Sequence, residues 1–81
     1  MKLTEKSKNV FNYVKEYGKV TTAEMAEHFG VNGRSISANV TDLKKKGLVD
    51  REIVQDGEAK LTYVFLTDEG KAFDPEAPVE E

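Results

Sequence analysis

Apolar residues recur at helical spacing in three stretches of the chain. The first covers residues 4–17, where Val10, Phe11, Val14 and Tyr17 form a stripe of apolar positions that we expect to face inward. Thr4 is the expected N-cap, and Gly18 stands where glycine commonly ends a helix. This pattern predicts one amphipathic helix that buries a single face.

A second, shorter helix is predicted to begin after Thr21. Thr21 and Glu24 have the spacing of a capping box, in which two side chains satisfy free backbone N–H groups. Met25 and Phe29 are one turn apart and are expected to point inward. The helix ends at the next glycine, and Val31 is expected to plug the turn that follows.

The third helix is predicted from Asn32, its N-cap, to Lys46. Ile36, Val40 and Leu43 have the i, i+4, i+7 spacing of a buried stripe. The opposite face is short, polar and positive, and it carries Arg34, Ser37, Ala38, Thr41 and Lys45. Such a face suits a groove of DNA better than a protein core.

After Gly47 the pattern changes from helical to alternating. Residues 48–54 and 60–66 predict two strands, and residues 55–59 predict the polar turn between them. Both sides of the return strand are largely apolar, so we expect helices to cover it in part. Residues 19–21 predict a third, short strand that pairs with this hairpin.

These elements predict an α+β winged helix-turn-helix, with a three-helix core, a β-hairpin wing and a short C-terminal helix over residues 68–73. Thr67 is the expected N-cap of this last helix. The chain of 81 residues allows one domain, which we expect to be residues 1–73. Residues 74–81 hold two prolines and four acids, and they predict a disordered tail.

Charge is distributed unevenly, although the net charge is only −3. Residues 1–67 hold eleven basic and nine acidic residues, whereas residues 68–81 hold one basic and six acidic residues. The helix from Asn32 to Lys46 has a net charge of +3. Positive charge therefore gathers where a DNA-reading helix needs it. Three lysines at its end also complement the helix dipole, and Lys46 needs no other role.

Candidate chemistry other than binding is not indicated. The chain has no cysteine and one histidine, His28, so we expect no metal site and no cofactor. No catalytic group of residues can be assembled, so we do not expect an enzyme. No apolar run reaches the length of a membrane span or a signal peptide, which predicts a cytoplasmic protein with no membrane partner.

Two segments resemble MarR-like winged-helix transcriptional regulators. Residues 31–49, with the pattern L-x-x-x-G-L-V, are similar to the recognition helix and following strand of that family, and Leu66–Lys71 resembles the L-T-x-x-G segment after its wing. The resemblance implies that the third helix enters the major groove of double-stranded DNA. It also implies that the hairpin tip reaches the neighbouring minor groove or backbone.

Candidate DNA contacts follow from this resemblance and from side-chain chemistry. The resemblance places Asn32, Arg34, Ser35 and Ser37 at positions that usually contact DNA. We expect Arg34, Ser35, Ser37 and Thr41 to face base edges. We expect phosphates to be neutralised by Lys44, Lys45, Arg51 and Lys60.

Three features depart from the family pattern. Ala38 stands where a long polar side chain is common, and Asp56-Gly57-Glu58 replaces the usual arginine at the wing tip. The chain is also too short for the long dimerisation helices. The acidic wing tip, Ala38 and the acidic tail favour the alternative hypothesis, a protein-interaction module on the same scaffold with a protein as partner. Under the DNA-binding hypothesis, useful specificity needs a homodimer or a tandem site. In a third hypothesis, the acidic tail competes with DNA for the basic helix.

Overall fold

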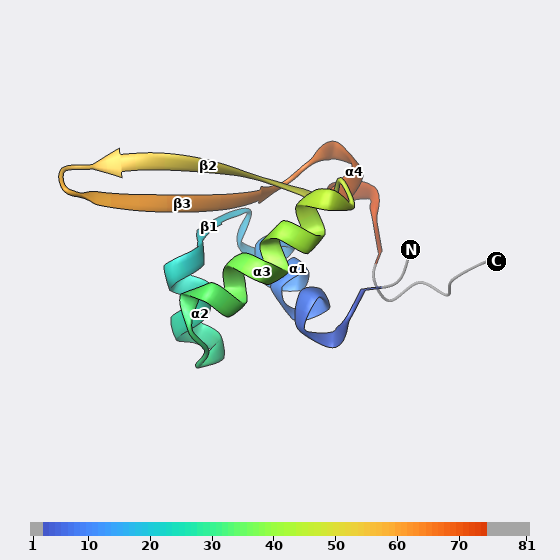
Figure 1. Cartoon of the computed structure of the whole chain (residues 1–81). Coiled ribbons are helices and arrows are strands. Elements are labelled where there is room, and N and C mark those ends of the chain that lie inside the picture. Colours follow the sequence, from blue (N-terminus) through green and yellow to red (C-terminus); the bar gives the residue numbers. More distant parts are fainter. Residues whose placement is uncertain (1–2, 75–81) are drawn as a thin grey trace.

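The computed structural model describes residues 3–74, which form a winged helix (Figure 1). The elements in chain order are α1 (Glu5–Tyr17), β1 (Lys19–Thr21), α2 (Thr22–Phe29), α3 (Gly33–Lys45), β2 (Val49–Asp56), β3 (Ala59–Leu66) and α4 (Asp68–Ala72). The predicted α+β architecture is confirmed, including the order of its elements. The predicted tail lies outside the described residues, apart from Asp74.

Each described helix begins at a polar residue whose side chain accepts a hydrogen bond from a backbone N–H three residues later. The acceptors and donors are Thr4 and Ser7 (3.2 Å), Thr21 and Glu24 (3.0 Å), Asn32 and Ser35 (2.8 Å), and Thr67 and Gly70 (3.0 Å). These bonds satisfy donors that have no partner inside the helix. All four N-caps agree with the sequence interpretation.

The sheet has the strand order β1-β3-β2, and both pairs are antiparallel. The hairpin is longer than predicted, because Asp56 pairs with Ala59 and only Gly57 and Glu58 form the loop. Gly57 has a φ of 62°, the left-handed conformation that glycine adopts without strain at the first loop position of a tight hairpin. The predicted five-residue turn was therefore wrong in length.

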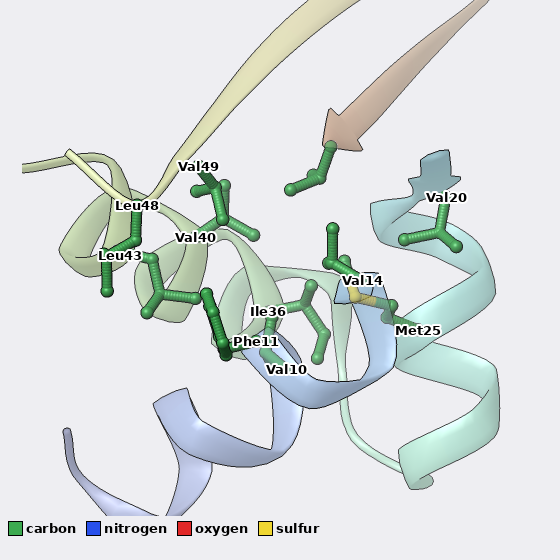
Figure 2. Packing of buried hydrophobic residues seen from close by; sticks show 11 residues of the cluster. Val10, Phe11, Val14, Val20, Met25, Ile36, Val40, Leu43, Leu48 and Val49 are labelled. Carbon is green, nitrogen blue, oxygen red and sulfur yellow. The ribbon is translucent and has the colours of Figure 1, made fainter. Parts of the chain in front are cut away.

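The core lies where the three larger helices meet the base of the sheet (Figure 2). It contains Val10, Phe11, Val14, Val20, Met25, Ile36, Val40, Leu43, Leu48, Val49 and Val64. The predicted inward stripes of α2 and α3 are thus confirmed, and that of α1 is confirmed for Val10, Phe11 and Val14. Tyr17 was also expected to face inward, but it is 57% exposed, because it stands in the last turn of α1 beyond the part of the helix that meets the core. Val31 is a correction: it is 42% exposed and does not plug the turn, and the buried positions of the two helices beside it are Met25 in α2 and Ile36, Val40 and Leu43 in α3.

The β2–β3 hairpin extends far beyond the helices (Figure 1). Residues 50–60 are all exposed, and the long axis of the described molecule measures 47 Å. Helices therefore cover the return strand only at its base, where Val64 is buried, and they leave its outer half to solvent. The result is a two-stranded arm that extends from the helical body of the domain (Figure 1).

Candidate nucleic-acid interface

The outward face of α3 carries Arg34, Ala38 and Lys45 in a row, and all three are exposed. Their spacing of four and seven residues keeps them within about 40° of one another around the helix. Within residues 3–74, no hydrogen bond or ion pair holds the Arg34 guanidinium. Its five donors are therefore available to an acceptor from outside the chain.

Ser37 and Thr41 lie on the same face and are linked to each other. The Thr41 hydroxyl donates a hydrogen bond to the Ser37 backbone carbonyl at 2.8 Å. Its proton is thus used inside the helix, so Thr41 offers a base edge only its lone pairs and its methyl group. Ser37 is exposed and keeps a free hydroxyl donor for an outside partner.

Asn32 and Ser35 stand at the beginning of α3 with different surroundings. The Asn32 amide oxygen caps the helix, which leaves the exposed amide NH2 group for other acceptors. Ser35 is half-buried and lies about 100° around the helix from Arg34, so it does not join the outward row. The contact between Ser35 and a base edge stays a prediction. The position of Ser35 favours such a contact less than the exposed position of Ser37 does.

The lysines at the end of α3 divide into two kinds. Lys46 forms an ion pair with Asp42 at 2.9 Å, and the Ser7 hydroxyl donates to the same carboxylate at 3.2 Å. The hydrogen bond from Lys46 lowers the pKa of Asp42 below its ordinary value of 3.8. Lys44 lies 3.6 Å from Asp50 across an exposed ion pair, and Lys45 is exposed on the outward face. Lys46 is thus structural, as its position at the helix end indicated.

The wing has two chemically different faces, because neighbouring strand residues point to opposite sides and paired residues share a side. Burial of Val49 and Val64 identifies the side turned to the helices. This inner face also carries Arg51, Ile53, Gln55, Lys60, Thr62 and Leu66. The outer face carries Asp50, Glu52, Val54, Asp56, Ala59, Leu61, Tyr63 and Phe65.

Because of this separation, the strand acids of the wing do not lie on the same face as its basic residues. Arg51 and Lys60 lie on the inner face, and no ion pair or hydrogen bond holds their side chains within the described chain. The side chain of Asp56, which belongs to the acidic segment that replaces the usual arginine, points to the outer face. Among the acidic residues of the wing, only Glu58 lies in the loop at the tip. The alternation of charge in Asp50-Arg51-Glu52 was the sequence signal for this arrangement.

Other kinds of site are not indicated in residues 3–74. They hold no group of three or more histidine, cysteine or carboxylate residues that could bind a metal ion. No helix in this part of the chain has the length and apolarity needed to cross a membrane.

A helix-turn-helix followed by a β-hairpin, with an exposed basic second helix, defines a winged-helix domain of the DNA-reading type. The model of the MarR family matches residues 3–58. The chain belongs to the MarR family. A MarR-like transcriptional regulator is among the similar proteins with solved structures.

Two solved structures illustrate the likeness. A MarR-like transcriptional regulator from Thermotoga maritima is 30% identical with a TM-score of 0.73, and the match covers 86% of this chain and 49% of that one. A mutant MarR from E. coli complexed with operator DNA is 22% identical with a TM-score of 0.71, at the same coverage. The second likeness shows the fold. This chain spans about half the length of either regulator.

One curated relative is an enzyme, unlike the two proteins with solved structures. Riboflavin kinase from Archaeoglobus fulgidus is 29% identical over 62 residues, which make up 76% of this chain and 25% of the kinase. The chain thus spans a quarter of that protein. The match concerns one part of the kinase, so similarity alone assigns no chemistry to this chain.

Proposed function

We propose that this domain binds double-stranded DNA with α3 in the major groove and acts in transcriptional regulation. Arg34 and Ser37 read base edges, and Asn32, Ser35 and Thr41 add contacts where their remaining donors or acceptors allow. Lys44, Lys45, Arg51 and Lys60 neutralise phosphates on either side. The domain itself is not catalytic, and the cytoplasm is the compartment that we propose for it.

The unpaired guanidinium of Arg34 on the outward face of α3 carries this proposal. An exposed arginine without a partner contributes little to the stability of the fold, but it can pair bidentately with guanine. Arg51 and Lys60 support the same orientation, because they lie on the helix side of the wing. A single winged helix contacts few base pairs, so we propose that two copies or a longer protein supply useful specificity.

The test is fluorescence anisotropy with labelled duplex DNA, one of random sequence and one from the region upstream of the protein's own gene, over a series of salt concentrations. We expect affinity to fall steeply with salt and to be largely lost in Arg34→Ala/Lys45→Ala. Lys6→Ala/Lys15→Ala is the matched control, since it removes two exposed charges from α1. Absence of binding by the folded protein at low salt would refute the proposal.

A further inference from the structure

The outer face of the wing holds a continuous apolar row beside an acidic row. Leu61, Tyr63 and Phe65 follow one another along the middle strand and are only half-buried. Asp50, Glu52 and Asp56 follow the neighbouring strand, with Val54 opposite Leu61. Of these acids, Asp50 is already paired with Lys44 of α3 at 3.6 Å. The buried core residues of the strands all point to the other side. Within residues 3–74, helices reach the outer face only at its base, where Phe65 lines a pocket with Lys15 of α1 and Lys71 of α4.

One cation already occupies part of this face. The Lys19 ammonium lies 3.1 Å from a Glu52 carboxylate oxygen. The same ammonium lies 5.2 Å from the ring centre of Tyr63 and 5.8 Å from that of Phe65. Both ring distances are within the range of cation–π attraction. The combination of a carboxylate and two aromatic rings therefore accepts an ammonium group at this place on the sheet.

Acidic and apolar rows of this kind are complementary to a helix with a leucine stripe and basic residues along one side. The row from Leu61 to Phe65 is about 13 Å long, which matches a helix of roughly nine residues. An added strand would instead pair with backbone groups at an edge of the sheet. The features lie on the face, so they favour a helix that packs across it.

We propose that the outer face of the wing docks a basic amphipathic helix of a partner protein. Leucine-like side chains of the helix pack on Leu61, Tyr63 and Phe65, and its lysine or arginine side chains pair with Glu52 and Asp56. This docking function goes beyond DNA binding. The two surfaces belong to opposite faces of the wing, so both partners bind at once.

Charge along the face also gives the helix a direction. Phe65 lines a pocket of about 350 Å³ together with Lys15 and Lys71, whereas Asp56 lies at the far end of the hairpin. The carboxyl end of a helix carries a partial negative charge and its amino end a partial positive charge. The docked helix therefore places its carboxyl end over Phe65 and its amino end toward Asp56.

The test uses a synthetic peptide of roughly 18 residues, long enough to be helical, with leucine on one face and lysine beside it. A scrambled peptide of the same composition loses the stripe, and a lysine–serine peptide keeps the charge alone. Each peptide is added to the 15N-labelled protein without DNA, and amide chemical shifts are followed. The amphipathic peptide should bind about tenfold more tightly than either control, with shifts on the outer face.

Variants make the site specific. Glu52→Lys should weaken the amphipathic peptide about tenfold, and Tyr63→Thr, which keeps a strand-forming residue, should weaken it similarly. Glu16→Lys makes the same charge change at an exposed position of α1 and should leave the affinity unchanged. Equal binding of all three peptides, or shifts located on α3 or the inner face, would overturn the proposal. Outer-face shifts that depend on protein concentration alone would identify a second copy as the occupant and would also overturn it.

The docking proposal and the DNA proposal fail separately. The peptide titration contains no DNA, and Glu52→Lys changes no residue assigned to DNA contact. Where the protein binds duplex DNA, the peptide should still produce its outer-face shifts on the complex. Loss of these shifts on adding DNA would refute simultaneous docking and leave the DNA interface intact.

Discussion

Gly70 lies against the backbone carbonyl of Leu48, so closely that a Cβ added at Gly70 would overlap the carbonyl oxygen. The same carbonyl accepts the Thr67 backbone N–H at 3.1 Å. The Thr67 hydroxyl donates to the Gly47 carbonyl at 2.6 Å and accepts the Gly70 N–H at 3.0 Å. Together these contacts fasten α4 to the turn that joins α3 to β2.

We expect Gly70→Ala to lower the free energy of unfolding by about 1–3 kcal/mol, because backbone must move to admit the methyl group. Gly33→Ala is the control, since Gly33 has open space around its Cβ position and no positive φ. That substitution should be neutral or stabilising by up to ~1 kcal/mol. Urea unfolding followed by circular dichroism measures both, and equal midpoints for the two variants would contradict the packing argument.

Arg34→Ala should weaken binding to a cognate duplex by ~1–3 kcal/mol and relax preference at one base pair. The physical reason is loss of a bidentate donor from the outward face of α3. Anisotropy with a set of duplexes that differ at single positions measures both effects. A uniform loss across all duplexes would reassign Arg34 to a phosphate, and unchanged affinity would remove it from the interface.

Arg51 and Lys60 are expected to act through phosphates. Each lost phosphate contact reduces the slope of log K against log salt by about 1, so Arg51→Ala/Lys60→Ala should reduce it by roughly 2. Removal of Asp56 from the outer face by Asp56→Asn should leave the slope nearly unchanged, because that side chain points away from the inner face. The reverse order of effects would mean that the wing presents its other face to DNA.

Asp42 should make stability depend on acid pH. Its pKa is lowered from 3.8, first by the hydrogen bond from Lys46, so its ionised form stabilises the fold above the unfolded value. This contribution is lost as the pH falls through the folded-state pKa. Asp42→Asn should be less stable than the parent near neutral pH, with the gap closing below about pH 4. Urea unfolding at stepped pH values measures the gap, and a constant gap would exclude this linkage.

The phenol of Tyr13 should ionise at a higher pH than an ordinary tyrosine. Its hydroxyl donates to Glu24 at 2.9 Å, and this bond raises the pKa of Tyr13 from 10.0 to about 12. A raised pKa means that the stabilising contribution is complete below the unfolded value and is lost as the pH rises between these two values. An absorbance titration of the phenolate should show a late component that Tyr13→Phe removes and Glu24→Gln moves toward lower pH. A titration that is the same in the parent and Glu24→Gln would refute the coupling.

The elements of the fold follow from local chemistry, and this is why the sequence predicted them. Thr4, Thr21, Asn32 and Thr67 cap helices through bonds that span three residues, and such bonds need no tertiary information. The stripe of Ile36, Val40 and Leu43 likewise defines the buried side of α3. By contrast, Val31 was predicted to be buried from its apolarity alone, and the structure leaves it exposed.

Features that depend on contacts between residues far apart in the sequence were harder to predict. The length of the hairpin depends on whether Gln55 pairs with Lys60, and a polar composition does not decide this. Glu24 looked like half of a capping box, yet its carboxylate accepts from Tyr13 on another helix. The candidate site is mixed in the same way: helix periodicity placed Arg34, but only the strand register separates Arg51 from the acids beside it.

Side chains alternate along a strand, so the basic and acidic residues of β2 lie on opposite faces because they occupy odd and even positions. Deletion of a single residue between Arg51 and Asp56, with the loop kept in place, would exchange the basic and acidic faces of the residues before it. The deletion would leave composition and net charge almost unaltered. A change of one residue in the length of this strand thus reverses the charge of the helix-facing surface. Shortening by two residues at a time preserves that charge.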